Sequence, residues 1–169
     1  MTDEIAVVGG GLVGTAIGWG LARLGHRVTV FDEDDAVQRA SRANFALIWV
    51  QSKGLGMPAY AQWSRQAAGH WPALAALLKQ QTGHDVHLEQ KGGFALCLSE
   101  SELARRVARL EQLNAQPGSR LPYDVMDHAA VTRMVPAIGP DVIGGIFCPL
   151  DGHVNSPRLR FPSSGKIQR

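Results

Sequence analysis

The chain has 169 residues, of which 45% are hydrophobic and 19% are charged, a balance that excludes an intrinsically disordered chain. The formal net charge of +2 gives no sign of a nucleic-acid-binding surface, so no nucleic-acid partner is expected. The two cysteines, Cys97 and Cys148, lie far apart without a Cys-x-x-Cys spacing, which argues against a disulfide scaffold and a zinc ribbon.

A targeting signal has a basic segment followed by an apolar one, and the start of this chain has no such pattern. The longest apolar runs, residues 5–14 and 45–50, are much shorter than the about 20 residues that a membrane span needs. We therefore expect no transmembrane segment, and a cytoplasmic protein.

The first predicted elements form a βαβ unit. The apolar run 5–8 is typical of a buried parallel strand, and residues 11–24 have apolar side chains at helical spacing, with Gly25 as the C-terminal cap. A second strand follows at 27–31. Two parallel strands joined by a helix predict a right-handed crossover.

The middle of the chain predicts a mixture of helices and strands. After an ordered loop over 39–56, a helix is expected over 58–82, with a kink or restart at Pro72. The tryptophans of this helix, Trp63 and Trp71, are expected in the core together with Trp49. The other predicted elements are strands at 86–89 and 93–98, a helix at 99–113 with a Ser99–Glu102 capping box, a strand at 123–126, a short helix from Asp127, and a strand at 142–148.

The last residues predict a helix start that does not continue. Ser156 before Pro157 is a favourable N-cap, but residues 162–165, Pro-Ser-Ser-Gly, would end the helix after about one turn. This pattern is typical of a chain that has been cut short.

Three glycines carry the main chemical signal. Gly9, Gly11 and Gly14 fit G-x-G-x-x-G between the first strand and the first helix. Gly9 permits a tight turn, Gly11 lets the backbone approach a pyrophosphate, and Gly14 allows close packing of helix on strand. The helix N-terminus offers free N–H groups to the phosphates. The pattern predicts a dinucleotide-binding site.

The second strand ends at Asp32, where a carboxylate can accept hydrogen bonds from ribose hydroxyls and would repel a 2′-phosphate. NADP is therefore disfavoured, and NAD and FAD remain. Gly18, four residues after Gly14, extends the small-residue face of the helix as in many flavin proteins, and the chain lacks the alternating strands and helices of a plain NAD domain. These features favour FAD, with an NAD-dependent dehydrogenase as the alternative.

Three later stretches resemble a known family: Arg-Ala-Ser-Arg-Ala-Asn-Phe-Ala-Leu-Ile-Trp at 39–49, Gly-Gly-Ile-Phe-Cys at 144–148 and Asp-Gly-His-Val-Asn-Ser-Pro-Arg-Leu at 151–159. Together with the glycine motif they are similar to the FAD-dependent amino-acid oxidase/dehydrogenase family. Within it, residues 4–160 resemble the group of glycine oxidase, the hydrogen cyanide synthase C subunit and the opine oxidase B subunit. The resemblance implies an α/β fold: a Rossmann-like FAD-binding βαβ unit with part of an α+β substrate domain, an incomplete glutathione-reductase-type flavoprotein.

The resemblance also implies roles for single residues. Many relatives carry glycine where Ala46 stands. Leu12 and Val13 would contact the FAD pyrophosphate, Asp32 and Glu33 the adenosine ribose, Ala40 and Ser41 the pyrophosphate, and Phe45, Ala46 and Leu47 would pass near the flavin ring.

The implied function is oxidation of the C–N bond of a small amino acid or secondary amine by hydride transfer to FAD, and no catalytic residue can be named. Family members are about twice as long, so the alternative is a catalytically incomplete FAD-binding fragment or subunit that needs a partner subunit. The expected division is 1–57, part of the FAD-binding domain; 58–155, helices and strands leading into a partial substrate domain; and 156–169, a truncated helix and irregular tail.

Three histidines are further candidates. His84 and His87 invite a metal site, but no third ligand is evident, so solvated side chains are expected. A role for His153 near the substrate is a hypothesis from the resemblance. Cys97 and Cys148 lie in apolar strands and are expected to be buried.

Overall fold

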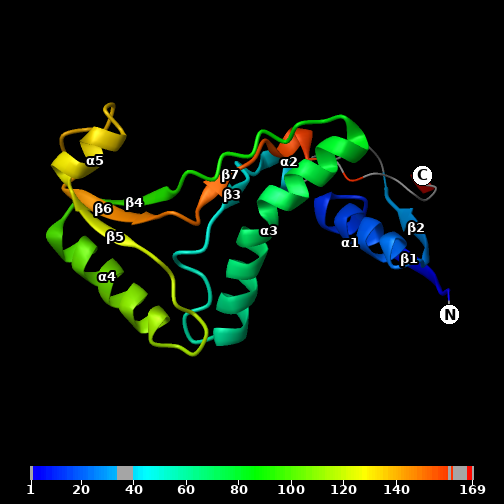
Figure 1. The fold of residues 1–169 in the computed structure, drawn as a ribbon, viewed down its shortest axis with the longest axis horizontal. Coiled ribbons are helices and arrows are strands. Elements are labelled where there is room, and N and C mark those ends of the chain that lie inside the picture. The colour runs from blue at the N-terminus through cyan, green and yellow to red at the C-terminus, as the bar shows by residue number, and fades with distance from the viewer. Residues whose placement is uncertain (1, 34–39, 160, 162–166, 169) are drawn as a thin grey trace. The chain divides into compact units, whose positions relative to one another are not determined.

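A computed structural model describes residues 2–33, 40–159, 161 and 167–168 (Figure 1). The chain divides into two compact units. The first comprises residues 1–46, 72–88 and 154–169, and the second comprises residues 47–71 and 89–153. The domain boundaries expected from the sequence, at 57/58 and 155/156, stay a prediction.

The first unit is built on the predicted βαβ motif. Strand β1 (Glu4–Val8) pairs in parallel with β2 (Arg27–Phe31), and β2 pairs in parallel with β8 (Ile167–Gln168). Helix α1 (Leu12–Arg23) packs against β1 and β2. The close approach needs a small residue, because a Cβ atom on the buried Gly18 would lie 3.1 Å from Cγ2 of Val30.

Two short elements that contact each other complete this unit. They are helix α2 (Ala40–Ala43) and a 3₁₀ turn, η1 (Ser156–Arg158). The N-cap of η1 is Asn155, whose Oδ1 accepts a hydrogen bond from the amide of Arg158, so the prediction of Ser156 as the cap is wrong. The Ser156 hydroxyl instead donates to the carbonyl of Asn44. The helix break predicted at 162–165 lies outside the described residues.

Helix α3 (Pro58–Thr82) has the predicted bounds and runs through Pro72 as one helix. It ends where Gly83 adopts a φ of +71°, a conformation that favours glycine. Trp63 is 67% exposed, so its predicted place in the core is wrong. The second unit covers a different face of the helix, where Ala61 and Ala68 are buried two turns apart.

The second unit contains an antiparallel sheet in the order β4–β6–β5, with β6 (Gly144–Cys148) between β4 (Gly93–Cys97) and β5 (Asp124–Asp127). Helix α4 (Glu100–Asn114) packs against β4 and β6, and α5 (His128–Met134) packs against β5 and β6 (Figure 1). The core side chains between these layers are Leu110, Leu113, Val131 and Ile146, each at most 3% exposed.

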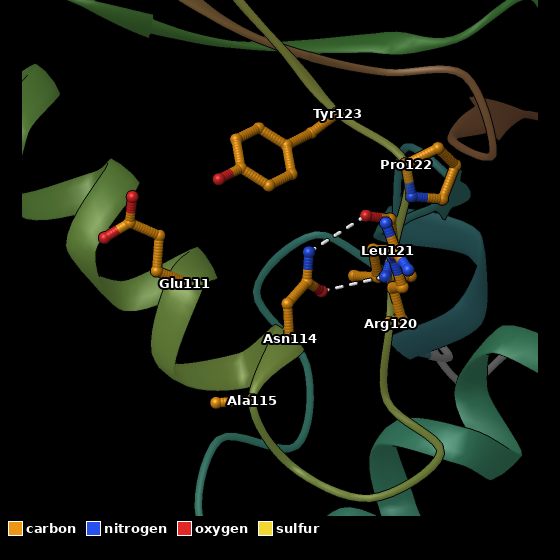
Figure 2. A pocket seen from close by; sticks show the side chains of 7 residues that line it. All are labelled: Glu111, Asn114, Ala115, Arg120, Leu121, Pro122 and Tyr123. Atoms are coloured by element: carbon orange, nitrogen blue, oxygen red, sulfur yellow. Dashed lines mark hydrogen bonds between the residues drawn. The ribbon is translucent and has the colours of Figure 1, made fainter.

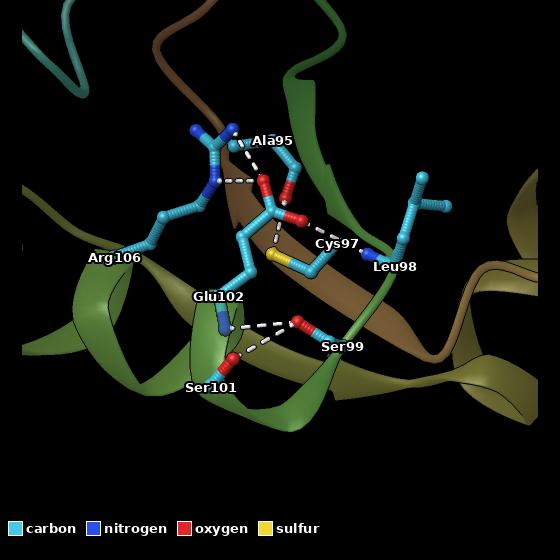
Figure 3. A network of polar contacts seen from close by, with 7 residues as sticks. All are labelled: Ala95, Cys97, Leu98, Ser99, Ser101, Glu102 and Arg106. Atoms are coloured by element: carbon cyan, nitrogen blue, oxygen red, sulfur yellow. Dashed lines mark hydrogen bonds and ion pairs between the residues drawn. The ribbon is translucent and has the colours of Figure 1, made fainter.

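The predicted capping box starts helix α4 (Figure 3). The Ser99 hydroxyl accepts a hydrogen bond from the amide of Glu102 at 3.2 Å. The Glu102 carboxylate accepts from the amide of Leu98 at 3.0 Å and pairs with Arg106 at 2.9 Å. These two contacts lower the pKa of Glu102 below its ordinary value. The Ser99 half of the capping box therefore forms as predicted, whereas the Glu102 carboxylate accepts from the amide of Leu98 rather than from that of Ser99.

The strand predicted over 86–89 is wrong. His87 has a φ of +49°, outside the strand region, and its amide donates to the side chain of Asp85. This Asx turn takes the place of a strand ladder. Glu89 forms an isolated antiparallel bridge with His153, rather than a hairpin with β4. His153 belongs to β7 (Gly152–His153), which pairs with β3 (Leu47–Ile48).

Candidate cofactor-binding site

The first glycine of the motif makes the turn that ends β1. Gly9 has a φ of +102°, and its amide donates to the carbonyl of Phe31 at 2.7 Å, so the carboxyl ends of β1 and β2 meet at this turn. A Cβ atom on Gly14 would lie 1.8 Å from the carbonyl oxygen of Gly9. Helix α1 can therefore start directly against the turn only because position 14 has no side chain.

The start of α1 offers free donors. Its N-cap is Gly11, which has no side chain to accept the amides of the first turn. A Cβ atom on Gly11 would meet no atom of the described chain within 4 Å, so the space over this turn is open. Backbone donors at a helix N-terminus, with open space above them, fit the diphosphate of a dinucleotide.

Asp32 lies beside the same turn. A Cβ atom on Gly10 would sit 2.4 Å from Oδ2 of Asp32, so the carboxylate lies against the backbone of the glycine motif. Its other oxygen, Oδ1, accepts a hydrogen bond from the amide of Glu33 at 2.9 Å. The predicted diphosphate-binding turn and the predicted ribose-binding acid thus lie together at the carboxyl ends of two parallel strands. The residues present fit an ADP moiety.

The other predicted contacts lie in three segments. Leu12 and the exposed Val13 form the first turn of α1, and Glu33 is exposed after β2. Ala40 and the half-buried Ser41 begin α2. Each of these residues lies in the first unit, and its contact with FAD stays a prediction.

The segment predicted to pass the flavin has an unusual backbone. Ala46 has a φ of +52°, a conformation that favours glycine. Its amide donates to Oδ1 of Asn44 at 2.7 Å, and its carbonyl accepts from the amide of Val154 at 3.2 Å. Phe45 is 76% exposed, and Leu47 begins β3 in the second unit.

Sequence reasoning missed a buried polar cluster in the second unit. Asp151 has no exposed surface, and its carboxylate accepts hydrogen bonds from the amide of Val50 at 2.6 Å and from Nε2 of Gln51 at 2.7 Å. Burial raises the pKa of Asp151, against the opposing effect of these hydrogen bonds. The sequence offered one signal for this cluster, because Asp151 is the only acidic residue in the apolar stretch 146–154. Its partners lie about 100 residues away in the sequence, so the cluster itself could not be predicted.

The other candidate residues have simpler surroundings. His84, His87 and His153 are exposed, and across the described part of the chain no three histidine, cysteine or acidic side chains gather as a metal site would need. The role of His153 near a substrate stays a hypothesis. Cys97 and Cys148 are buried as predicted, and burial raises the pKa of the Cys148 thiol to about 11.

A cavity of about 810 Å³ lies in the second unit between the end of α4 and the chain that leads to β5 (Figure 2). Asn114 bonds both backbone groups of Leu121: its Nδ2 donates to the carbonyl, and its Oδ1 accepts from the amide. None of the residues predicted to bind the cofactor lines this cavity. The lining residues are Glu111, Asn114, Ala115, Arg120, Leu121, Pro122 and Tyr123.

The chain is similar in sequence to two curated relatives and similar in fold to one solved structure. The chain is 46% identical to the B subunit of opine oxidase from Agrobacterium tumefaciens (strain Ach5) over 98% of its length, and 46% identical to the same subunit from Rhizobium meliloti over 92%. The crystal structure of glycine oxidase from Geobacillus kaustophilus matches with a TM-score of 0.79 and 30% identity, over 94% of this chain and 42% of that one. The predicted α/β class with a Rossmann-like FAD-binding unit is confirmed.

The chain spans 45% and 42% of the two opine oxidase subunits that it matches, which is under half of their length. The family model described as DAO, FAD dependent oxidoreductase, matches residues 4–160. This match confirms FAD, rather than NAD, as the cofactor of the family, and it confirms the class of oxidoreductase. The chain belongs to the DAO family of FAD dependent oxidoreductases.

Proposed function

We propose that the first unit binds the ADP part of FAD across the turn after β1. The first-turn amides of α1, at Leu12, Val13 and Gly14, would hold the diphosphate, and Asp32 would accept hydrogen bonds from the ribose. The observation that carries this proposal is the position of the Asp32 carboxylate against Gly10, beside an open helix N-terminus. Glu33, Ala40 and Ser41 are proposed as neighbours of the same ligand.

We further propose that the protein oxidises the C–N bond of a small amino acid or of a secondary amine derived from one. This proposal is supported by the names of the relatives, opine oxidase and glycine oxidase. When bound, FAD supplies the two-electron acceptor for this oxidation, and water then hydrolyses the imine product. The role of this chain's residues is to hold and orient the cofactor.

A second proposal concerns this chain alone: it binds FAD but needs a partner for catalysis. The chain spans under half of the opine oxidase relatives, which are themselves named as subunits. In this proposal a partner subunit, or further polypeptide, supplies the groups that bind the substrate. The proposal of C–N bond oxidation, by contrast, expects the chain itself to support turnover.

One experiment separates these proposals. The purified chain is mixed with FAD, freed of unbound flavin, and its visible spectrum is recorded before and after anaerobic addition of glycine, N-methylglycine or an opine. Loss of the flavin absorbance supports oxidation by this chain. Retained flavin colour without bleaching supports the second proposal, and a chain that retains no flavin contradicts both.

A further inference from the structure

The Asp151 cluster joins two distant parts of the second unit. Val50 and Gln51 follow β3, whereas Asp151 lies in the turn between β6 and β7. The pairing of β3 with β7 makes a two-residue ladder, Leu47 with His153 and Ile48 with Gly152. A ladder this short is a weak constraint, so the carboxylate supplies much of the connection.

The side chain of Asp151 packs closely against the backbone of Gly93. A Cβ atom on Gly93 would lie 3.0 Å from Cβ of Asp151 and 3.1 Å from Cζ3 of Trp49. The backbone of Asp151 is also bonded, because its carbonyl accepts from the amide of Gly92 at 3.0 Å. Asp151 is therefore fixed from both its backbone and its side chain.

Gln51 is fixed as well, but it is not fully paired. Its Nε2 donates to Asp151 and to the carbonyl of Gly93 at 3.3 Å, which sets the orientation of the amide. Its Oε1 is buried and has no hydrogen-bond partner among the described residues. The bonds of Asp151 and of Gln51 Nε2 together fix the backbone that follows β3.

We propose that Asp151 is a positioning residue for the flavin: by holding Val50 and Gln51 it fixes residues 47–51, and with them the flavin-side end of the segment Phe45–Leu47. This inference rests on the proposed binding of FAD and on the prediction, taken from the family resemblance, that this segment passes near the flavin ring. Asp151 would not touch the cofactor. It would act on the flavin end and leave the ADP end, held by the first unit, unaffected.

The test uses Asp151→Asn in the full chain. In either orientation, the new amide turns its NH₂ group toward a donor, either the amide of Val50 or Nε2 of Gln51. The double variant Asp151→Asn with Gln51→Glu restores the bond between positions 51 and 151 with the roles exchanged, since the new carboxylate at position 51 accepts and the new amide at position 151 donates. It does not restore the bond from position 51 to the carbonyl of Gly93. Asp141→Asn, at an exposed acid of the same unit, is the matched control.

Two readouts are measured: hydrogen exchange at the Val50 amide, and the affinities for FAD and for ADP. In Asp151→Asn we expect exchange at Val50 to rise, and FAD binding to weaken about tenfold, the effect of one hydrogen bond to a charged group. The affinity for ADP stays unchanged. The double variant recovers part of the FAD affinity, and the control resembles the wild type.

The outcomes separate the two proposals. If the wild type binds no FAD, the proposed function fails and this proposal fails with it. If the wild type binds FAD and Asp151→Asn binds it equally well, only this proposal is overturned. Equal weakening of FAD and ADP would show that Asp151 only stabilises the fold, and it too would overturn the positioning role.

Discussion

Gly14→Ala should disrupt the candidate site where helix α1 packs against the turn at Gly9. The added methyl group would lie 1.8 Å from the carbonyl oxygen of Gly9, whereas carbon and oxygen ordinarily approach no closer than about 3.3 Å. Because the obstacle is backbone, no side-chain rotation relieves it. The start of α1 has to move by about 1.5 Å to restore that spacing.

The expected size follows from two opposing effects. Overpacking of this kind costs about 1–3 kcal/mol, and the better helix propensity of alanine returns about 1 kcal/mol. With a backbone obstacle we expect the upper end, a net loss of about 2 kcal/mol in the free energy of unfolding. For a chain of this length, that lowers Tm by about 4–8 °C. The displaced first-turn amides should weaken FAD binding by about tenfold or more.

Gly20→Ala is the matched control in the same helix. A Cβ atom on Gly20 would meet nothing within 4 Å, so this change should stabilise the helix by about 0.5–1 kcal/mol and leave FAD binding intact. Both variants are measured by thermal unfolding and by titration with FAD. The packing argument is refuted if Gly14→Ala matches the wild type, or if Gly20→Ala is equally harmful.

Four further predictions concern other parts of the chain. Asp32→Asn should weaken ADP and FAD binding by about tenfold in calorimetric titration, because it removes a charged acceptor for the ribose. Ser99→Ala should cost about 1 kcal/mol in urea unfolding through loss of the α4 cap, whereas Ser101→Ala, which removes only the contact between the exposed Ser101 hydroxyl and the Ser99 hydroxyl, should cost less. Ala46→Gly should leave stability unchanged or raise it by up to about 1 kcal/mol, because it relieves a left-handed φ; a clear loss in urea unfolding would contradict that reading of the backbone. Burial raises the pKa of Asp151, so protonated Asp151 stabilises the fold at low pH. This contribution should be lost as the pH rises from the ordinary pKa near 3.8 through the raised pKa of the folded state. Urea unfolding across this pH range should show a smaller decline in the free energy of unfolding for Asp151→Asn than for the wild type.

The parts of the fold that could be predicted are those set by neighbouring residues. The turn at Gly9, the close approach at Gly14 and the cap at Ser99 each follow from a pattern within a few positions of the sequence. The same holds for Gly83, which ends α3 at the expected residue. In each case local chemistry and the tertiary structure favour the same conformation.

The parts that could not be predicted depend on partners far away in the sequence. The run 86–89 has the alternation of a strand, but the Asx turn at Asp85 and the left-handed His87 remove it from the sheet. The buried state of Asp151 follows from Val50 and Gln51, about a hundred residues earlier, and no local pattern signals such a contact. The exposure of Trp63 depends on which face of α3 the second unit covers, and the composition of the helix does not specify that face.

The central claim is that the turn between β1 and α1 binds the ADP part of FAD. Its most direct test is thermal unfolding of the purified chain with FAD, ADP or NAD added separately. We predict that FAD and ADP both raise Tm, that ADP competes with FAD, and that both effects are smaller in Gly14→Ala. Protection by NAD without protection by FAD, or protection by FAD that ADP does not compete with, would contradict the claim.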